Sequence, residues 1–153
     1  MQQRTLFRAV FEEYAADPLP SRSAKGRFHD EDSGRTAYLA GKRITAWKEV
    51  IHRWMARPKS YRTAEVSVKV SKVVDLTDPG VQAKYGIDVL TLTGEDHEPC
   101  RRLARRIREE GAEAIWTFSR ADQPGGRQLV VFLDRLASGS SVRVRQVGPI
   151  EEE

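Results

Sequence analysis

The stretch TAYLAGKRITAWKEVIHRWMARPKSYRTAEVSVKV, residues 36–70, contains the three patterns on which the fold prediction rests. It opens with a short apolar run at 36–40, which predicts a strand. Residues 44–57 then carry apolar side chains at helical spacing, which predicts an amphipathic helix that ends before Pro58. Residues 60–70 alternate apolar and polar side chains, as a half-buried strand does.

The helix predicted at 44–57 carries Ile44, Trp47, Ile51 and Trp54 on one face, and we expect that face to pack on the core. Glu49 falls roughly opposite these side chains, so the periodicity alone indicates a solvated residue. A glutamate that lines a ligand site also lies on a polar face, so the helical projection does not decide between the two roles.

Outward from this stretch, further apolar patterns are separated by loops rich in Pro, Ser, Gly and charge. They predict strands at 5–10, 73–76, 113–118, 128–133 and 141–147, a helix at 97–111, a long loop at 17–35 and a turn at 78–80. This order indicates an α+β fold with mainly antiparallel strands and a few helices. We expect a single domain over residues 1–148 and a loose acidic tail at 149–153.

The composition fits a small globular protein with one core. The chain has 153 residues, of which 39% are hydrophobic, and 26 Lys and Arg against 22 Asp and Glu give a net charge of +4. That balance suits an anionic ligand or an acidic partner, but it is far below the charge density of a nucleic-acid-binding arm, so we expect little nucleic-acid contact. No run approaches 18 apolar residues and no signal peptide is visible, so we expect a cytoplasmic protein without membrane contact.

Cysteine and histidine usage excludes several kinds of site. Cys100 is the only cysteine, so a disulfide framework and a cysteine zinc site are both excluded. His29, His52 and His97 show no metal-ligand spacing, and we expect no metal. Neither a P-loop nor a dinucleotide-binding glycine motif is present, and no G-x-S-x-G elbow surrounds a serine, so a serine hydrolase is rejected.

Four polar residues lie near predicted element ends, in addition to Glu49. Arg8 lies in an apolar strand, where a guanidinium needs an anionic partner or an outward orientation. Arg27 follows Gly26, which lets the backbone approach a ligand closely. Tyr38 lies in the strand at 36–40 and is either a core residue or a flat surface for a base. Ser119 ends a strand, where it either caps a turn or contacts a ligand.

Arginines crowd the polar side of the helix at 97–111, at positions 101, 102, 105, 106 and 108. Several have glutamates at helical spacing, so we interpret this side as a solvated helix face. An electrostatic docking face for nucleic acid or an acidic partner is the alternative.

The combination of these motifs resembles the RES-domain family, NAD-consuming toxins named for an arginine, a glutamate and a serine. Leu6-Phe7-Arg8-Ala9-Val10 is similar to the family's opening strand, and Gly26-Arg27-Phe28 to its glycine–arginine–aromatic motif. Residues 36–40 followed by Glu49 resemble its tyrosine strand and glutamate helix, and residues 103–133 resemble its serine segment. Two stretches depart from the pattern: residues 29–34 are acidic where the family has an Asn-Pro-Pro-Gly-like turn, and residues 58–98 carry little that aligns.

The resemblance implies an ADP-ribosyltransferase-like fold and cleavage of the nicotinamide–ribose bond of NAD, with NAD as the substrate and an antitoxin protein as partner. Glu49 would stabilise the positive charge that develops on the ribose. Arg8 and Arg27 would hold the pyrophosphate, Tyr38 would orient the nicotinamide, and Ser119 would bond to the dinucleotide. The acceptor is left open between water, phosphate and a protein side chain. A transferase that modifies one protein target and a non-enzymatic binder that uses the arginine-rich helix and residues 142–145 are the alternatives.

Overall fold

The computed structural model describes residues 3–21, 25–54 and 60–151. Its strands are β1 (Arg4–Phe11), β2 (Thr36–Ala40), β3 (Tyr61–Lys69), β4 (Val73–Asp75), β5 (Ala114–Phe118), β6 (Arg127–Phe132) and β7 (Ser141–Val147). Its helices are α1 (Arg43–Trp54), α2 (Pro79–Tyr85), α3 (Val89–Leu92) and α4 (Glu98–Glu109), with short 3-10 helices η1 (Glu12–Tyr14) and η2 (Leu133–Arg135).

The strands form one seven-stranded sheet in the order β4-β5-β6-β2-β1-β3-β7. Every neighbouring pair is antiparallel except β4 and β5, which are parallel. The predicted α+β fold with mainly antiparallel strands and a few helices is therefore confirmed. The first three strands, β1, β2 and β3, occupy interior positions of the sheet. The later strands flank them: β4, β5 and β6 lie beyond β2, and β7 lies beyond β3.

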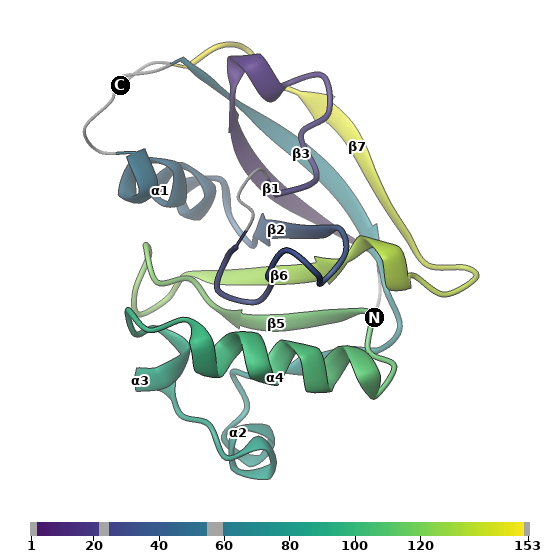
Figure 1. Ribbon diagram of the computed structural model, residues 1–153. Helices are drawn as coiled ribbons and strands as arrows, with labels where there is room; N and C mark the ends of the chain where they lie inside the picture. The colour runs from purple at the N-terminus through teal and green to yellow at the C-terminus, as the bar shows by residue number, and fades with distance from the viewer. Residues whose placement is uncertain (1–2, 22–24, 55–59, 152–153) are drawn as a thin grey trace.

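The two long helices cover one side of the sheet (Figure 1). Leu103, Ala104 and Ile107 of α4 pack with Ile115 of β5 and Phe132 of β6. Next to this cluster, α1 packs on β1 and β2, with Ala46 beside Ala9 and Ala40. The side chains of β2 that lie between these two clusters, Tyr38 among them, therefore lie between α1 and α4.

The other side of the sheet is covered mainly by the sheet itself, because the sheet curls. Val73 of β4 and Trp116 of β5 belong to the same apolar cluster as Val142 and Val144 of β7, although these strands lie at opposite ends of the strand order. The guanidinium of Arg4 on β1 lies 4.6 Å from the ring centroid of Trp116 on β5, so two strands that are not neighbours in the strand order are in contact on this side. Leu19 from the loop after η1 and Leu133 of η2 pack against the same cluster.

The predicted packing face of α1 is wrong. Ile44 and Trp47 are 50% and 36% exposed, whereas Thr45 and Ala46 are buried. The helix approaches the sheet over alanines, and small side chains on both surfaces let the backbones come close, which leaves the large apolar residues outside. The side chain of Trp54 and the boundary expected at Pro58 lie outside the described residues.

Residues 78–80, predicted as a turn, begin α2 instead. The Asp78 carboxylate accepts a hydrogen bond from the Gly80 N–H, and Pro79 occupies the first turn, where its missing N–H costs nothing. The acidic tail expected to be loose is held at Glu151, which pairs with Tyr61 through backbone bonds of 2.7 and 3.0 Å. Residues 152–153 of that tail lie outside the described residues.

A buried carboxylate, that of Glu113, joins both edges of the sheet. Glu113 is 1% exposed, and its carboxylate accepts bonds from the N–H groups of Ser71 and Lys72, just before β4, and of Ala137, before β7. Burial opposes ionisation, but these bonds and one from Ser140 outweigh it and lower the pKa of Glu113 to about 2.

We predict that Glu113→Gln lowers the free energy of unfolding at pH 7 by about 2 kcal/mol, because an amide leaves buried N–H donors without their acceptor. The folded-state pKa is depressed, so the stability from Glu113 is complete above pH about 4.5 and is lost as the pH falls toward 2. Urea unfolding at pH 7 and pH 3 checks both statements. Glu109→Gln, an exposed neighbour, is the control, and equal losses in the two variants would contradict the assignment.

Candidate functional site

A tight turn at residues 26–29 forms the centre of the candidate site. The Gly26 N–H donates to the His29 carbonyl at 2.9 Å, and Phe28 between them is fully buried in the α4 cluster. A β-carbon at Gly26 would lie 2.5 Å from His29 Cε1 and 2.6 Å from the Tyr38 hydroxyl oxygen. Glycine is therefore required here by space, for packing against His29 and Tyr38, while a close approach of its backbone to a ligand stays a prediction.

The Tyr38 hydroxyl holds this turn from β2. Its oxygen accepts the Phe28 N–H at 3.1 Å and lies 2.6 Å from His29 Nδ1, to which its own hydrogen can be donated. The two rings are tilted by 53° with centroids 5.5 Å apart. Contact of the half-buried Tyr38 ring with a nicotinamide stays a prediction, whereas its hydroxyl has a positioning role in the structure.

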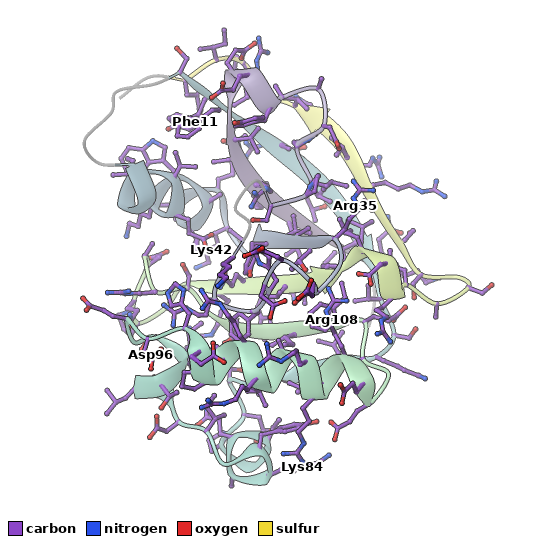
Figure 2. The ribbon with its side chains drawn as sticks, viewed as in Figure 1. Phe11, Arg35, Lys42, Lys84, Asp96 and Arg108 are labelled. Carbon is purple, nitrogen blue, oxygen red and sulfur yellow. The ribbon has the colours of Figure 1, made fainter. Side chains whose placement is uncertain are left out.

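The arginine-rich helix α4 holds the same turn from the other side. Arg101 Nε donates to the Gly26 carbonyl at 2.8 Å, and Arg105 forms an ion pair with Asp30 at 2.7 Å. Arg108, labelled in Figure 2, is 5% exposed; it donates to Asp134 and Thr36 and lies over the Phe132 ring. The interpretation of these arginines as a solvated face is wrong for Arg101 and Arg108, because the turn and the start of β2 supply internal acceptors.

Arg27 is 9% exposed, and within the described residues its Nη1 has no hydrogen-bond partner. Burial lowers the pKa of its guanidinium, and the positive charge of Arg120 lowers it further, while Cys100 acts in the opposite sense. A buried guanidinium with an unmet donor is costly unless an anion reaches it. This geometry suits a phosphate or carboxylate ligand.

The surroundings of Arg27 are positive and partly desolvated. Burial lowers the pKa of His97, and Arg27, Arg101 and Arg120 lower it further, so this imidazole stays neutral near pH 7. Arg120 directly follows Ser119. The loop after β5 therefore contributes positive charge to the region around the 26–29 turn.

Ser119 is fully buried, and its hydroxyl oxygen has no partner among the described residues. Its backbone is fixed, since the N–H donates to the Gly126 carbonyl at 3.0 Å and the carbonyl accepts from Asp122 at 3.3 Å. The Thr117 hydroxyl, two residues earlier on β5, is also buried and has no partner in the part of the chain that the structure describes. Two unmet hydroxyls at the end of β5 are consistent with the predicted ligand contact.

Asp122 joins the Ser119 loop to α1. Its carboxylate accepts the Thr45 hydroxyl at 2.7 Å and the Lys48 ammonium at 3.0 Å, and these bonds lower its pKa. Glu49 lies four residues after Thr45 and therefore on the same side of α1; its side chain is half-buried. This half-burial differs from the solvated position that the periodicity alone indicates, and the role of Glu49 toward a ligand stays a prediction.

Arg8 makes structural contacts. Its Nε donates to the Pro18 carbonyl at 2.9 Å and its Nη1 to the Tyr38 carbonyl at 3.1 Å, which ties β1 to the long loop and to β2. Backbone carbonyls thus satisfy the partner requirement of this strand arginine. Its role as a pyrophosphate ligand stays a prediction.

The structure brings Arg27 and Tyr38 together at one turn, and it ties the Ser119 loop to the helix that carries Glu49. Sequence reasoning missed His29, Arg101 and Asp122. For His29, the sequence signal is its three-residue separation from Gly26, which is the spacing of a tight turn. Arg101 and Asp122 lie in polar segments without a diagnostic pattern. In the described part of the chain, no three His, Cys, Asp or Glu side chains group closely enough to hold a metal ion.

The fold and site define an α+β domain with a buried cationic turn on the helix-bearing side of its sheet. The chain belongs to the RES-domain family, whose model matches residues 5–151. Its fold is similar to that of a chain in the crystal structure of the M. tuberculosis MbcT–MbcA toxin–antitoxin complex, with a TM-score of 0.79 and 21% sequence identity. The match covers 96% of this chain and 84% of that chain.

No curated protein matches the sequence. Among the residues that the structure describes, no helix has the length and apolar character needed to cross a bilayer.

We predict that Gly26→Ala lowers the free energy of unfolding by about 1–3 kcal/mol, because the new methyl group displaces His29 or the Tyr38 hydroxyl. Gly125→Ala is the matched control, since a β-carbon there meets nothing within 4 Å, and its effect should stay within about 0.5 kcal/mol. Thermal unfolding of both variants measures the difference. Equal stability of the two variants would show that the turn is not sterically closed.

Proposed function

We propose that this protein is a toxin that cleaves the nicotinamide–ribose bond of NAD. The observation that carries the proposal is the buried Arg27 guanidinium, whose Nη1 has no hydrogen-bond partner among the described residues, in a chain of the RES-domain family. A dinucleotide supplies the anion that such a group needs, because its pyrophosphate accepts charge-assisted hydrogen bonds from a guanidinium.

In this proposal the residues divide between binding and catalysis. Arg27 holds the pyrophosphate, and the Ser119 hydroxyl bonds to the dinucleotide. Arg8 and the Tyr38 hydroxyl keep β1, β2 and the 26–29 turn in place, and the Tyr38 ring orients the nicotinamide. Arg101 and Arg120, whose positive charges lower the pKa of His97, keep this side of the site favourable for an anion.

The reaction breaks the bond between ribose C1′ and the nicotinamide nitrogen. Nicotinamide leaves with the bonding electron pair, and the ribose carries positive charge in an oxocarbenium-like state. The Glu49 carboxylate stabilises that charge. Water or phosphate then forms the new bond to C1′ and, in the case of water, releases its proton to solvent.

One solved structure with a similar fold is that of a toxin–antitoxin complex. By analogy, we propose that an antitoxin protein neutralises this chain and that the chain acts in the cytoplasm, where NAD is available. The transferase alternative keeps the same site and differs only in the acceptor. The binder alternative keeps fewer cations of the helix, because Arg101 and Arg108 are used inside the protein.

We predict that Glu49→Gln lowers NAD cleavage at least about a hundredfold with the fold intact, because the amide no longer stabilises the developing charge. Nicotinamide release from NAD by the purified protein, with and without phosphate, measures the loss and distinguishes hydrolysis from phosphorolysis. Glu109→Gln is the control for a lost negative charge. Normal NAD cleavage by the Glu49 variant would remove Glu49 from catalysis, and transfer of label from NAD to a protein would favour the transferase.

We predict that Ser119→Ala leaves thermal stability unchanged or raises it, because it removes a buried hydroxyl that has no partner among the residues described by the structure. The same change should weaken NAD binding by about 3- to 10-fold, as expected for one lost hydrogen bond. Calorimetric unfolding and equilibrium binding of NAD test the two halves separately. A large loss of stability with unchanged NAD affinity would make Ser119 a structural residue only.

A further inference from the structure

A basic groove lies at the β7 edge of the sheet, away from the candidate site. It has a volume of about 590 Å³, and three cations, Lys69, Arg143 and Arg145, line it together with Ser67, Ser140 and Ser141. Among the described residues, no acidic side chain lines the groove. Within the described residues, no carboxylate forms an ion pair with any of the three cations, so their charge is available to a ligand.

The pairing register sets the spacing of these groups. Ser67 is opposite Arg143 and Lys69 is opposite Ser141, so these four side chains lie on one face of the β3–β7 pair. Residues two positions apart on a strand are separated by about 7 Å. A second strand alongside β7 would therefore present every other side chain to this basic face.

The opposite face of β7 is apolar and incompletely covered. Val66 and Val68 of β3 are fully buried, whereas Val142 and Val144, their partners on β7, are half-buried. The difference arises because β7 is the last strand in the sheet order and nothing continues the sheet beyond it. An added strand with apolar residues on that face would cover these two valines.

The backbone of β7 is also available on its outer side. In the described part of the chain, residues 142–146 form backbone pairs only with β3. Strands of this kind bind extended peptides by forming a further antiparallel or parallel ladder. Charged side chains and a bulge also protect an edge from aggregation, and β7 has both, since its register with β3 shifts between Glu65 and Val66. Protection does not, however, require a groove that three cations line.

The lining selects among anionic ligands. No aromatic side chain lines the groove, so it lacks the stacking surface on which single-stranded nucleic acid binds. It also lacks the apolar walls that are typical of small-molecule sites of this volume. Carboxylates on an extended polypeptide fit both the cations and the free edge.

We propose that the β7 edge binds an extended acidic peptide segment of a partner protein, in which carboxylate and apolar side chains alternate. The carboxylates contact Lys69, Arg143 and Arg145, the apolar residues cover Val142 and Val144, and the peptide backbone pairs with β7. This surface is separate from the proposed NAD site, since β1 lies between β3 and the β2 strand that carries Tyr38.

The test uses the full chain and a fluorescein-labelled nine-residue peptide in which glutamate alternates with valine, followed by fluorescence anisotropy. We expect binding that weakens with added salt. The double variant Arg143→Glu with Arg145→Glu should bind the peptide at least about tenfold more weakly. Arg102→Glu, on the exposed side of α4, makes the same kind of charge change elsewhere and should leave binding unchanged.

Altered peptides test the mechanism on the unmodified protein. A glutamine-for-glutamate peptide and a peptide N-methylated at alternate residues should each lose most of the affinity, because they lack the charge and the backbone donors respectively. Overturning results are equal binding of either altered peptide, equal binding to the double variant, or no binding of the acidic peptide at all. Tighter binding of an oligothymidine of equal length, lost in the double variant, would overturn the proposal in favour of nucleic acid.

Discussion

The space around Gly26 is the constraint on which the helix-bearing side of this protein depends. No side chain fits between Gly26, His29 and the Tyr38 hydroxyl, so the chain turns there within four residues. The turn is held from β2 by Tyr38 and from α4 by Arg101. A strand and a helix that are distant in sequence therefore meet at one short segment, and that segment carries Arg27.

The arginines of this site region separate into two groups by their partners. Arg8, Arg101 and Arg108 donate to carbonyls, a hydroxyl or a carboxylate inside the protein, and their cost of burial is offset by those bonds. Arg27 Nη1 and Arg108 Nε are both buried without a hydrogen-bond partner within the described residues, but Arg108 is paired with the Asp134 carboxylate, whereas no carboxylate of the described residues forms an ion pair with Arg27. Positive charge is thus used for structure around the site and is left unneutralised at the position where an anion would bind.

The sequence was sufficient to predict the strands, the antiparallel architecture and the segments that carry the candidate residues. It failed for the packing side of α1. The spacing of the large apolar residues predicts that they face the sheet, whereas the buried side of the helix is the one that carries Thr45 and Ala46. It also failed for Arg101 and Asp122. Their partners, Gly26 and Thr45, lie 75 and 77 residues away in sequence, and local periodicity contains no information about such contacts.

The curl of the sheet has a consequence for how substitutions combine. Val73 and Val142 belong to strands at opposite edges, yet they line one apolar cluster that contains few residues from helices. A larger residue at one edge therefore presses on the other edge, and a compensating reduction in volume can come from a strand that is not its neighbour in the sheet. Coupled pairs of variable positions in such a domain are expected across the interior of the curl as well as along the ladders.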